Sequence, residues 1–293
     1  MSNEELLEIV KAGYEAGIRK VHWTGGEPLV RTSIVDVVRR SKEIGIQEQS
    51  MTTNGVLLPD LCLNLKEAGL DRVNISLDTP DPGRFSKITG RDYFDYVLEG
   101  LELASKLFQP LKLNVVVLRG YNYPDEIPNF VELGRMYNAA VRFIELMPYG
   151  PAFEGEDGGE RFSRFYVSRE EILNELRQLG SLRELDVNDV RGHNGVAVYY
   201  SIDGGSPPVG VIAPHSMGYA CAGYRCRKIR VGPNGKVTWC VNEDSITLAG
   251  LSYTEKVEIL AKLVERKNYC RQQGKYPQRH MPAYASLRFG RHE

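Results

Sequence analysis

Three cysteines lie close together in the last third of the sequence, and they could bind a metal. Four residues separate Cys221 from Cys226, and thirteen separate Cys226 from Cys240. Three thiolates suit a [4Fe–4S] cluster that keeps one iron open. They also suit a zinc ion whose fourth ligand is not cysteine, and His215 is a candidate for that ligand. Unligated structural cysteines are the alternative.

Polar residues also gather where four of the expected strands end. These ends are residues 24–28 (TGGEP), 52–55 (TTNG), 76–78 (SLD) and 145–148 (ELMP). In a parallel barrel, ligands bind at the carboxyl ends of the strands because the βα loops gather there. Glycines such as those at 25 and 26 let the backbone approach a ligand without an obstructing Cβ. Each motif alone is typical of a turn, but four such ends in succession favour a binding site.

Positively charged residues occur at two places where they could hold an anion. Lys112 lies in the expected strand at 112–118, where burial of an unpaired ammonium is costly. Lys112 therefore either points inward and binds a ligand, or faces outward from an edge strand. Lys228 and Arg230 follow the second cysteine of the triplet, at a spacing that places both on one side of an extended backbone. A solvated basic face is the alternative for this pair.

Strands and helices that alternate along the first half of the chain are expected to position these residues. The expected strands, rich in Val and Ile, are residues 20–24, 49–54, 72–78, 112–118 and 141–147. The intervening segments, which place apolar residues at i, i+3 and i+4, are 33–45, 61–69, 93–107 and 127–137. This alternation predicts parallel strands with right-handed crossovers, and therefore a barrel or a doubly wound sheet. The chain begins with an amphipathic helix (1–17), whereas a complete barrel begins with a strand.

The second half of the chain is expected to form a smaller α+β region. Residues 149–160 are acidic and rich in glycine, which predicts a mobile loop. The elements expected after it are a helix at 169–180, strands at 196–202, 209–213 and 235–241, and a helix at 255–273. The predicted division is 1–148 for the barrel core and 149–293 for the region that carries the cysteine triplet.

The overall composition narrows the classes of function. The 293 residues are 42% hydrophobic and carry a formal net charge of −1, which gives no general attraction to nucleic acid or to a membrane surface. No apolar stretch is long enough to span a bilayer, and the acidic N-terminal helix differs from a targeting peptide. We therefore expect a cytoplasmic protein with no nucleic-acid or membrane partner. Five cysteines, an odd and sparse set, argue against a disulfide framework.

The motifs TGGEPLVR, TTNG, NISLDT and RFIELMP, followed by the cysteine triplet, resemble the GTP 3′,8-cyclase family of the radical S-adenosylmethionine (radical SAM) superfamily. The resemblance implies an α/β fold, a partial (β/α)6 barrel of TIM type that lacks its first strand. It also implies a lyase of molybdenum cofactor biosynthesis that uses SAM and iron–sulfur clusters. In that family an adenosyl radical removes the 3′ hydrogen of GTP, and the carbon radical then attacks C8 of the guanine. A homodimer is a possible assembly.

The same resemblance implies roles for individual residues. The residues implied to bind SAM are Gly26, Glu27, Ser76 and Met147. Those implied to bind GTP or another purine nucleoside triphosphate are His22, Thr52, Lys112, Lys228 and Arg230. Those implied to hold an auxiliary [4Fe–4S] cluster over the open end of the barrel are Cys221, Cys226 and Cys240. In this layout we expect Lys112, Lys228 and Arg230 to converge on the triphosphate.

The sequence departs from the family pattern at several positions. The 293 residues contain no CxxxCxxC motif, which in the family holds the cluster that cleaves SAM. We therefore expect an N-terminal truncation of about 40–60 residues, judged from the family layout. The chain as given would then be inactive, and a second [4Fe–4S] cluster would occur only in a full-length form. The triplet has four residues rather than two between its first cysteines, His22 and Lys228 stand where the family has arginine, and the chain ends FGRHE rather than Gly-Gly.

These departures keep three alternative interpretations open. The first is a catalytically silent paralogue that binds a nucleotide and a cluster. The second is a diverged radical SAM enzyme that acts on another purine nucleotide. The third is a structural protein in which the three cysteines and His215 bind one zinc ion, and analysis for iron and sulfide distinguishes it from the others.

Overall fold

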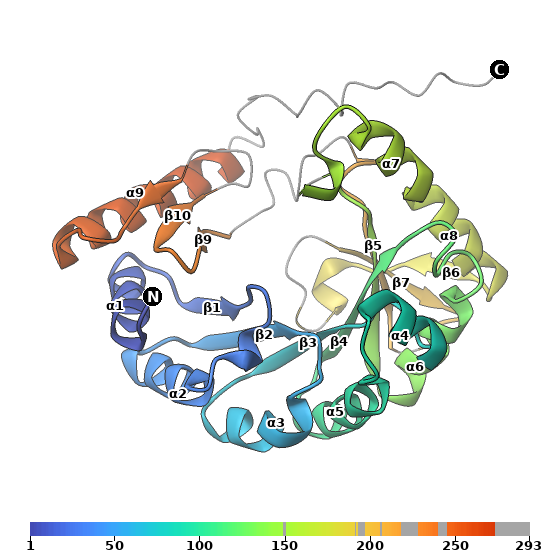
Figure 1. Ribbon diagram of the computed structural model, residues 1–293, viewed down its shortest axis with the longest axis horizontal. Coiled ribbons are helices and arrows are strands. Elements are labelled where there is room, and N and C mark those ends of the chain that lie inside the picture. The colour runs from blue at the N-terminus through green and yellow to red at the C-terminus, as the bar shows by residue number, and fades with distance from the viewer. Residues whose placement is uncertain are drawn as a thin grey trace.

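The computed structural model describes most of the chain, and its helices and strands alternate as expected over the first half (Figure 1). The described residues are 1–148, 151–190, 192, 197–205, 207–217, 228–239 and 245–272. The helices are α1 (Asn3–Glu15), α2 (Ile34–Ile44), α3 (Leu58–Glu67), α4 (Pro82–Thr89), α5 (Phe94–Leu107), α6 (Ile127–Met136), α7 (Gly158–Phe165), α8 (Arg169–Gln178) and α9 (Tyr253–Gln272). The strands are β1 (Lys20–Trp23), β2 (Glu48–Thr53), β3 (Arg72–Ser76), β4 (Leu111–Val117), β5 (Ala139–Glu145), β6 (Leu182–Glu184), β7 (Val198–Ile202), β8 (Val209–Ile212), β9 (Arg230–Val231), β10 (Lys236–Thr238) and β11 (Ile246–Thr247).

The main sheet has the strand order of a barrel rather than of a doubly wound sheet. Its order is β1-β2-β3-β4-β5-β8-β7-β6, and β1 to β5 and then β8 are parallel to one another. Because successive parallel strands are neighbours, right-handed crossovers place the helices on one face. In Figure 1 the strands form a curved wall with α2, α3 and α5 along its outer side. The predicted partial parallel barrel is therefore confirmed.

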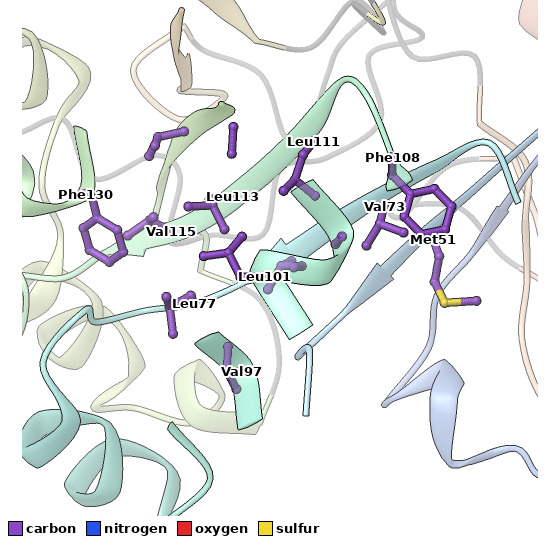
Figure 2. Packing of buried hydrophobic residues seen from close by; sticks show 14 of the residues in the cluster. Met51, Val73, Leu77, Val97, Leu101, Phe108, Leu111, Leu113, Val115 and Phe130 are labelled. Carbon is purple, nitrogen blue, oxygen red and sulfur yellow. The ribbon is translucent and has the colours of Figure 1, made fainter. Parts of the chain in front are cut away.

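The outer face of this wall carries the hydrophobic core. Strand residues such as Met51, Val73 and Leu113 are fully buried there. Figure 2 shows them together with side chains of the covering helices, including Leu101 of α5 and Phe130 of α6. Alternate residues of these strands point to the opposite, inner face. The covering helices therefore bind the sheet through one set of side chains and leave the other set for the interior.

The ends of several helices follow directly from local sequence. Ser2 begins α1 and Ser168 begins α8, and each forms a capping box with the glutamate three residues later, Glu5 and Glu171. Gly45 ends α2 with φ of 113°, a conformation that favours glycine.

The second half of the chain contributes to two separate sheets. Strands β6, β7 and β8 continue the main sheet beyond residue 148, while β9, β10 and β11 form a small antiparallel sheet. The small sheet packs with α9 and α1 around a second hydrophobic cluster that includes Ile9, Trp239 and Leu260. Lys256 of α9 forms an ion pair of 3.0 Å with Glu8 of α1. The beginning and the end of the described chain therefore lie side by side, as Figure 1 also shows.

Part of the second half differs from expectation. Residues 149–160 were expected to form a mobile loop, but residues 151–153 form a turn of 3-10 helix and α7 begins at Gly158. Aromatic contacts between Phe162 of α7 and both Phe153 and Tyr166 stabilise this segment, and glycine content alone does not reveal them. In the first half of the chain, the sequence did not predict helix α4, because it is short and its apolar face is small. In the described part of the chain, no helix combines the length and the hydropathy that a membrane span requires.

Candidate functional site

The inner face of the main sheet carries polar residues in aligned rows. Paired residues of adjacent parallel strands project from the same face, so the register of the strands defines each row. The first row is His22, Ser50 and Arg72, the second is Thr52, Asn74 and Lys112, and the third is Ser76, Asn114 and Arg142. Parallel strands are usually apolar on both faces, and this polar face therefore marks a candidate binding surface.

His22 is held by hydrogen bonds through both ring nitrogens. Nδ1 lies 2.7 Å from Ser50 Oγ and Nε2 lies 2.9 Å from Thr52 Oγ1, while Asn74 Nδ2 donates to the same Thr52 hydroxyl over 3.0 Å. Burial, together with neighbouring positive charges led by Lys228, lowers the pKa of His22 to about 4. The imidazole is therefore neutral near pH 7 and does not add to the positive charge of this face.

Lys112 is buried in the central strand β4, with 2% of its surface exposed. Its Nζ donates to the carbonyl oxygen of Gly192 over 2.6 Å, and Arg72 Nη1 donates to the same oxygen over 2.9 Å. Arg72 also forms an ion pair with Glu48. Burial, together with the charges of Arg142, Arg72 and Lys228, lowers the pKa of Lys112 to about 7. Lys112 therefore lies inward and is not an exposed lysine of an edge strand.

Arg142 completes the positively charged part of the inner face. Its side chain is buried, its Nε donates to Asn114 Oδ1 over 2.8 Å, and it also interacts with Tyr199. Neither Arg142 nor Arg72 was singled out from the sequence. The available signal was the alternation in Arg72-Val-Asn74-Ile-Ser76, which places the polar residues on one face and the apolar residues on the other.

The structure brings together some of the predicted substrate residues. Lys228 is exposed, and its charge acts on both His22 and Lys112, which places it near the inner face. Arg230 lies two residues further on, half-buried in β9, where its backbone pairs with Thr238. Arg72, Lys112, Arg142 and Lys228 therefore converge on the inner face. Such a group can hold a multiply charged anion through charge-assisted hydrogen bonds.

The predicted SAM residues lie at the carboxyl ends of the strands. Gly26 is exposed just after β1, Ser76 ends β3, and Met147 follows β5. A Cβ added at Gly26 would meet no atom within 4 Å, so the backbone there is open to a ligand. The Glu27 carboxylate accepts hydrogen bonds from Leu29 N (3.0 Å), Thr53 Oγ1 (2.7 Å) and Asn54 N (2.7 Å). Glu27 therefore joins the loops that follow β1 and β2. The open backbone and polar strand ends fit an adenosyl group.

The described barrel does not fit an iron–sulfur cluster. Residues 1–148 contain one cysteine, Cys62, which lies buried on α3 within the hydrophobic core. Burial raises the pKa of its thiol to about 11, whereas a cluster requires thiolates. Cys221, Cys226 and Cys240 lie outside the described residues. Within the part of the chain that is described, no group of three or more His, Cys, Asp or Glu side chains could hold a metal ion.

The sequence matches two family models in succession. Residues 1–134 match the Radical SAM superfamily, and residues 139–276 match the family described as Molybdenum Cofactor Synthesis C. The chain is 40% identical over 270 residues to a GTP 3′,8-cyclase of Alkaliphilus oremlandii, covering 90% of this chain and 79% of that protein. It is 35% identical over 253 residues to a probable GTP 3′,8-cyclase of Pyrococcus abyssi, covering 85% of this chain and 78% of the relative.

Solved structures resemble the chain in fold. The crystal structure of Streptococcus suis SuiB bound to S-adenosylmethionine has a TM-score of 0.58 at 14% identity, covering 90% of this chain and 60% of that one. A second SuiB structure has a TM-score of 0.53 at 15% identity, covering 84% of this chain and 57% of that one. At this level of identity the likeness supports the fold alone.

Proposed function

We propose that this chain, which belongs to the GTP 3′,8-cyclase family of the radical SAM superfamily, binds GTP against the inner face of its barrel. The observation that carries the proposal is the convergence of Arg72, Lys112, Arg142 and Lys228 on that face. Glu48 pairs with Arg72, so the group keeps a net positive charge that suits a triphosphate. The corresponding reaction is the cyclisation of GTP in molybdenum cofactor biosynthesis.

The residues of this chain would bind and orient two ligands. The buried cations would hold the triphosphate, and guanidinium groups can grip its oxygens in pairs. Gly26, Glu27, Ser76 and Met147, at the strand ends, would hold SAM, with the Gly26 backbone open to it and Glu27 keeping the neighbouring loop in place. Bound SAM supplies the radical chemistry after which the superfamily is named. The barrel residues would exclude water and bring the two ligands together.

Calorimetry with GTP tests the nucleotide site. Replacement of Lys112 by alanine (Lys112→Ala) should weaken GTP binding about ten- to a hundred-fold, because a charge-assisted hydrogen bond contributes about 1.5–3 kcal/mol. Lys106→Ala is the matched control, since Lys106 is an exposed lysine on α5 that pairs with Glu102. GTP binding that is equal in the parent and in Lys112→Ala would contradict the proposed site.

The cysteine triplet is proposed to hold one auxiliary [4Fe–4S] cluster through Cys221, Cys226 and Cys240. The support is the set of three thiolates in one short stretch of sequence. After reconstitution the chain should contain about four iron atoms, the content of one such cluster. Cys226→Ala should lose this iron, while Cys270→Ala, outside the triplet, should retain it. Retained iron in Cys226→Ala would argue against this site, and one zinc atom per chain would favour a zinc site instead.

A different purine nucleotide is a second candidate substrate, favoured by one observation. His22, which stands where the family has arginine, is neutral and has both nitrogens occupied, so this position contributes no charge to the anion site. Competition between ATP and GTP in the same calorimeter distinguishes the two candidates. If the parent prefers ATP and His22→Arg prefers GTP, His22 determines which purine nucleotide the site binds.

A further inference from the structure

A chain of hydrogen bonds links four uncharged side chains on the inner face of the sheet. It begins at Asn74 of β3, passes through Thr52 of β2 to His22 of β1, and ends at Ser50 of β2. Thr52 Oγ1 lies 3.0 Å from Asn74 Nδ2 and 2.9 Å from His22 Nε2, and His22 Nδ1 lies 2.7 Å from Ser50 Oγ. The buried cations of the proposed triphosphate site lie on β3, β4 and β5. The chain of hydrogen bonds therefore suits the uncharged part of a nucleotide, its ribose or its base.

The surroundings of Asn74 determine which way its amide group points. The side chain is buried, and the strand register places Asn74 between Thr52 of β2 and Lys112 of β4. A positive charge on the Lys112 side favours the amide oxygen there, which leaves the amide NH2 group for Thr52. This orientation agrees with the contact in which Asn74 Nδ2 donates to Thr52 Oγ1. The Thr52 oxygen is thus an acceptor towards Asn74.

One arrangement of hydrogens lets every member of the chain donate to the next. A threonine hydroxyl has one hydrogen and two acceptor positions, and a neutral imidazole has one N–H group and one bare nitrogen. If Thr52 donates to His22 Nε2, the ring proton is on Nδ1, which donates to Ser50 Oγ. Hydrogen bonds aligned in one direction strengthen one another. The other tautomer makes Thr52 accept twice and leaves its hydroxyl hydrogen without a partner among the described residues.

We infer that Asn74 is a positioning residue of the nucleotide site, because its amide sets the direction of this chain of hydrogen bonds. When the chain runs from Asn74 to Ser50, Thr52 offers an acceptor position to a ligand and Ser50 offers its hydroxyl hydrogen. This pair suits a ribose, whose hydroxyl groups both donate and accept. The inference rests on the proposed nucleotide site. It gives Asn74 a role that acts through neighbouring hydroxyls and not through charge.

The tautomer of His22 tests the direction of the chain, and nitrogen-15 NMR of the imidazole at pH 8 measures it. The parent should carry the ring proton on Nδ1. In Asn74→Asp the new carboxylate can only accept, so Thr52 should donate to it and His22 should carry its proton on Nε2. Asn114→Asp is the matched control, because Asn114 is an asparagine of the same face whose side chain accepts from Arg142. This control should keep the tautomer of the parent.

Nucleotide binding provides a second measurement. Asn74→Ala should weaken GTP binding by up to about tenfold, the contribution of one hydrogen bond, because the direction of the chain is no longer fixed. Binding of inorganic triphosphate should be the same in Asn74→Ala and in the parent, since Asn74 does not act on the cations. Calorimetry measures both affinities. In the NMR spectra, His22→Arg identifies the signals of His22 by their loss.

Each result decides for or against the role of Asn74. A ring proton on Nε2 in the parent, or the parent's tautomer in Asn74→Asp, would overturn the inference. A change of tautomer in Asn114→Asp would assign the effect to negative charge on this face in general, with the same consequence. Unchanged GTP binding in Asn74→Ala, or equal weakening of GTP and triphosphate, would also overturn it. A parent that binds neither ligand would contradict the proposed function, and the tautomer alone would then decide whether Asn74 sets the direction of the chain.

Discussion

The pKa of Lys112 makes both the stability of the fold and the binding of an anion depend on pH. Its ammonium lies in the central strand near Arg72, Arg142 and Lys228, and burial with these charges lowers its pKa from 10.5 to about 7. Between pH 7 and 10.5 the unfolded chain therefore binds more protons than the folded chain. The contribution of Lys112 to the free energy of unfolding rises with pH through this window and is lost as the pH falls towards 7.

Nucleotide binding should reverse this shift. A bound triphosphate favours the charged ammonium, so at pH 8 binding should take up as much as about one proton, and GTP affinity should fall as the pH rises above 7. Calorimetry at pH 8 in two buffers of different ionisation enthalpy measures this uptake. Lys112→Met retains most of the side-chain volume but should lose the uptake. Equal uptake in the parent and in Lys112→Met would assign the proton to another group.

At the scale of elements, the packing of α6 on β5 depends on the absence of a side chain at Gly134. A Cβ at this position would lie 2.7 Å from Val141 Cγ2 and 2.8 Å from the carbonyl oxygen of Ala139. The helix therefore approaches the strand backbone more closely than any other residue would permit.

Gly134→Ala should therefore lower the free energy of unfolding by about 1–3 kcal/mol, the usual cost of overpacking. Denaturant titration measures the change. Gly83→Ala on the exposed helix α4 is the control, because the nearest atom there is a side-chain oxygen of Asp81 at 3.3 Å. Alanine has a higher helix propensity than glycine, so Gly83→Ala should be as stable as the parent or slightly more stable. Equal stability of Gly134→Ala and the parent would mean that α6 can move away from β5 without cost.

At the scale of the whole molecule, the core consists of a large cluster and a small one. The large cluster lies between the main sheet and its helices, and the small one joins α1, α9 and the small sheet. Leu260 of α9 is fully buried in the small cluster. The ion pair between Lys256 and Glu8 adds a contact at its edge. Among the described residues, α9 and the small sheet therefore pack against the N-terminal helix α1.

Leu260→Ala should destabilise the small cluster by about 2–5 kcal/mol, the usual cost of removing a buried leucine side chain. Amide exchange should become faster in β10 and α9 while β4 and β5 keep the protection of the parent. Leu63→Ala is the control, since 57% of the Leu63 surface is exposed. Equally fast exchange in β4 and β5 would show instead that the two clusters unfold as one unit.

The sequence by itself determined the alternation of parallel strands and helices, and its resemblance to a known family implied the partial barrel. The helical period of 3.6 and the strand period of 2 are local properties, so the alternation of elements up to residue 148 could be recognised without any long-range information. The same periods left Lys112 open between an inward and an outward placement, and its burial in β4 decided for the inward one. The sequence also located the cysteine triplet, which lies beyond the residues that the structure describes.

The tertiary structure alone decided which side chains meet. Arg72 and Arg142 lie 70 residues apart in the sequence and act on Lys112 together only because strand register aligns β3, β4 and β5. The neutral state of His22 likewise depends on burial and on charges from distant segments. Glu145 meets Ser216 across 71 positions of sequence. Such contacts depend on the register of strands that are distant in sequence and on the burial that results, and a local sequence pattern contains neither of them.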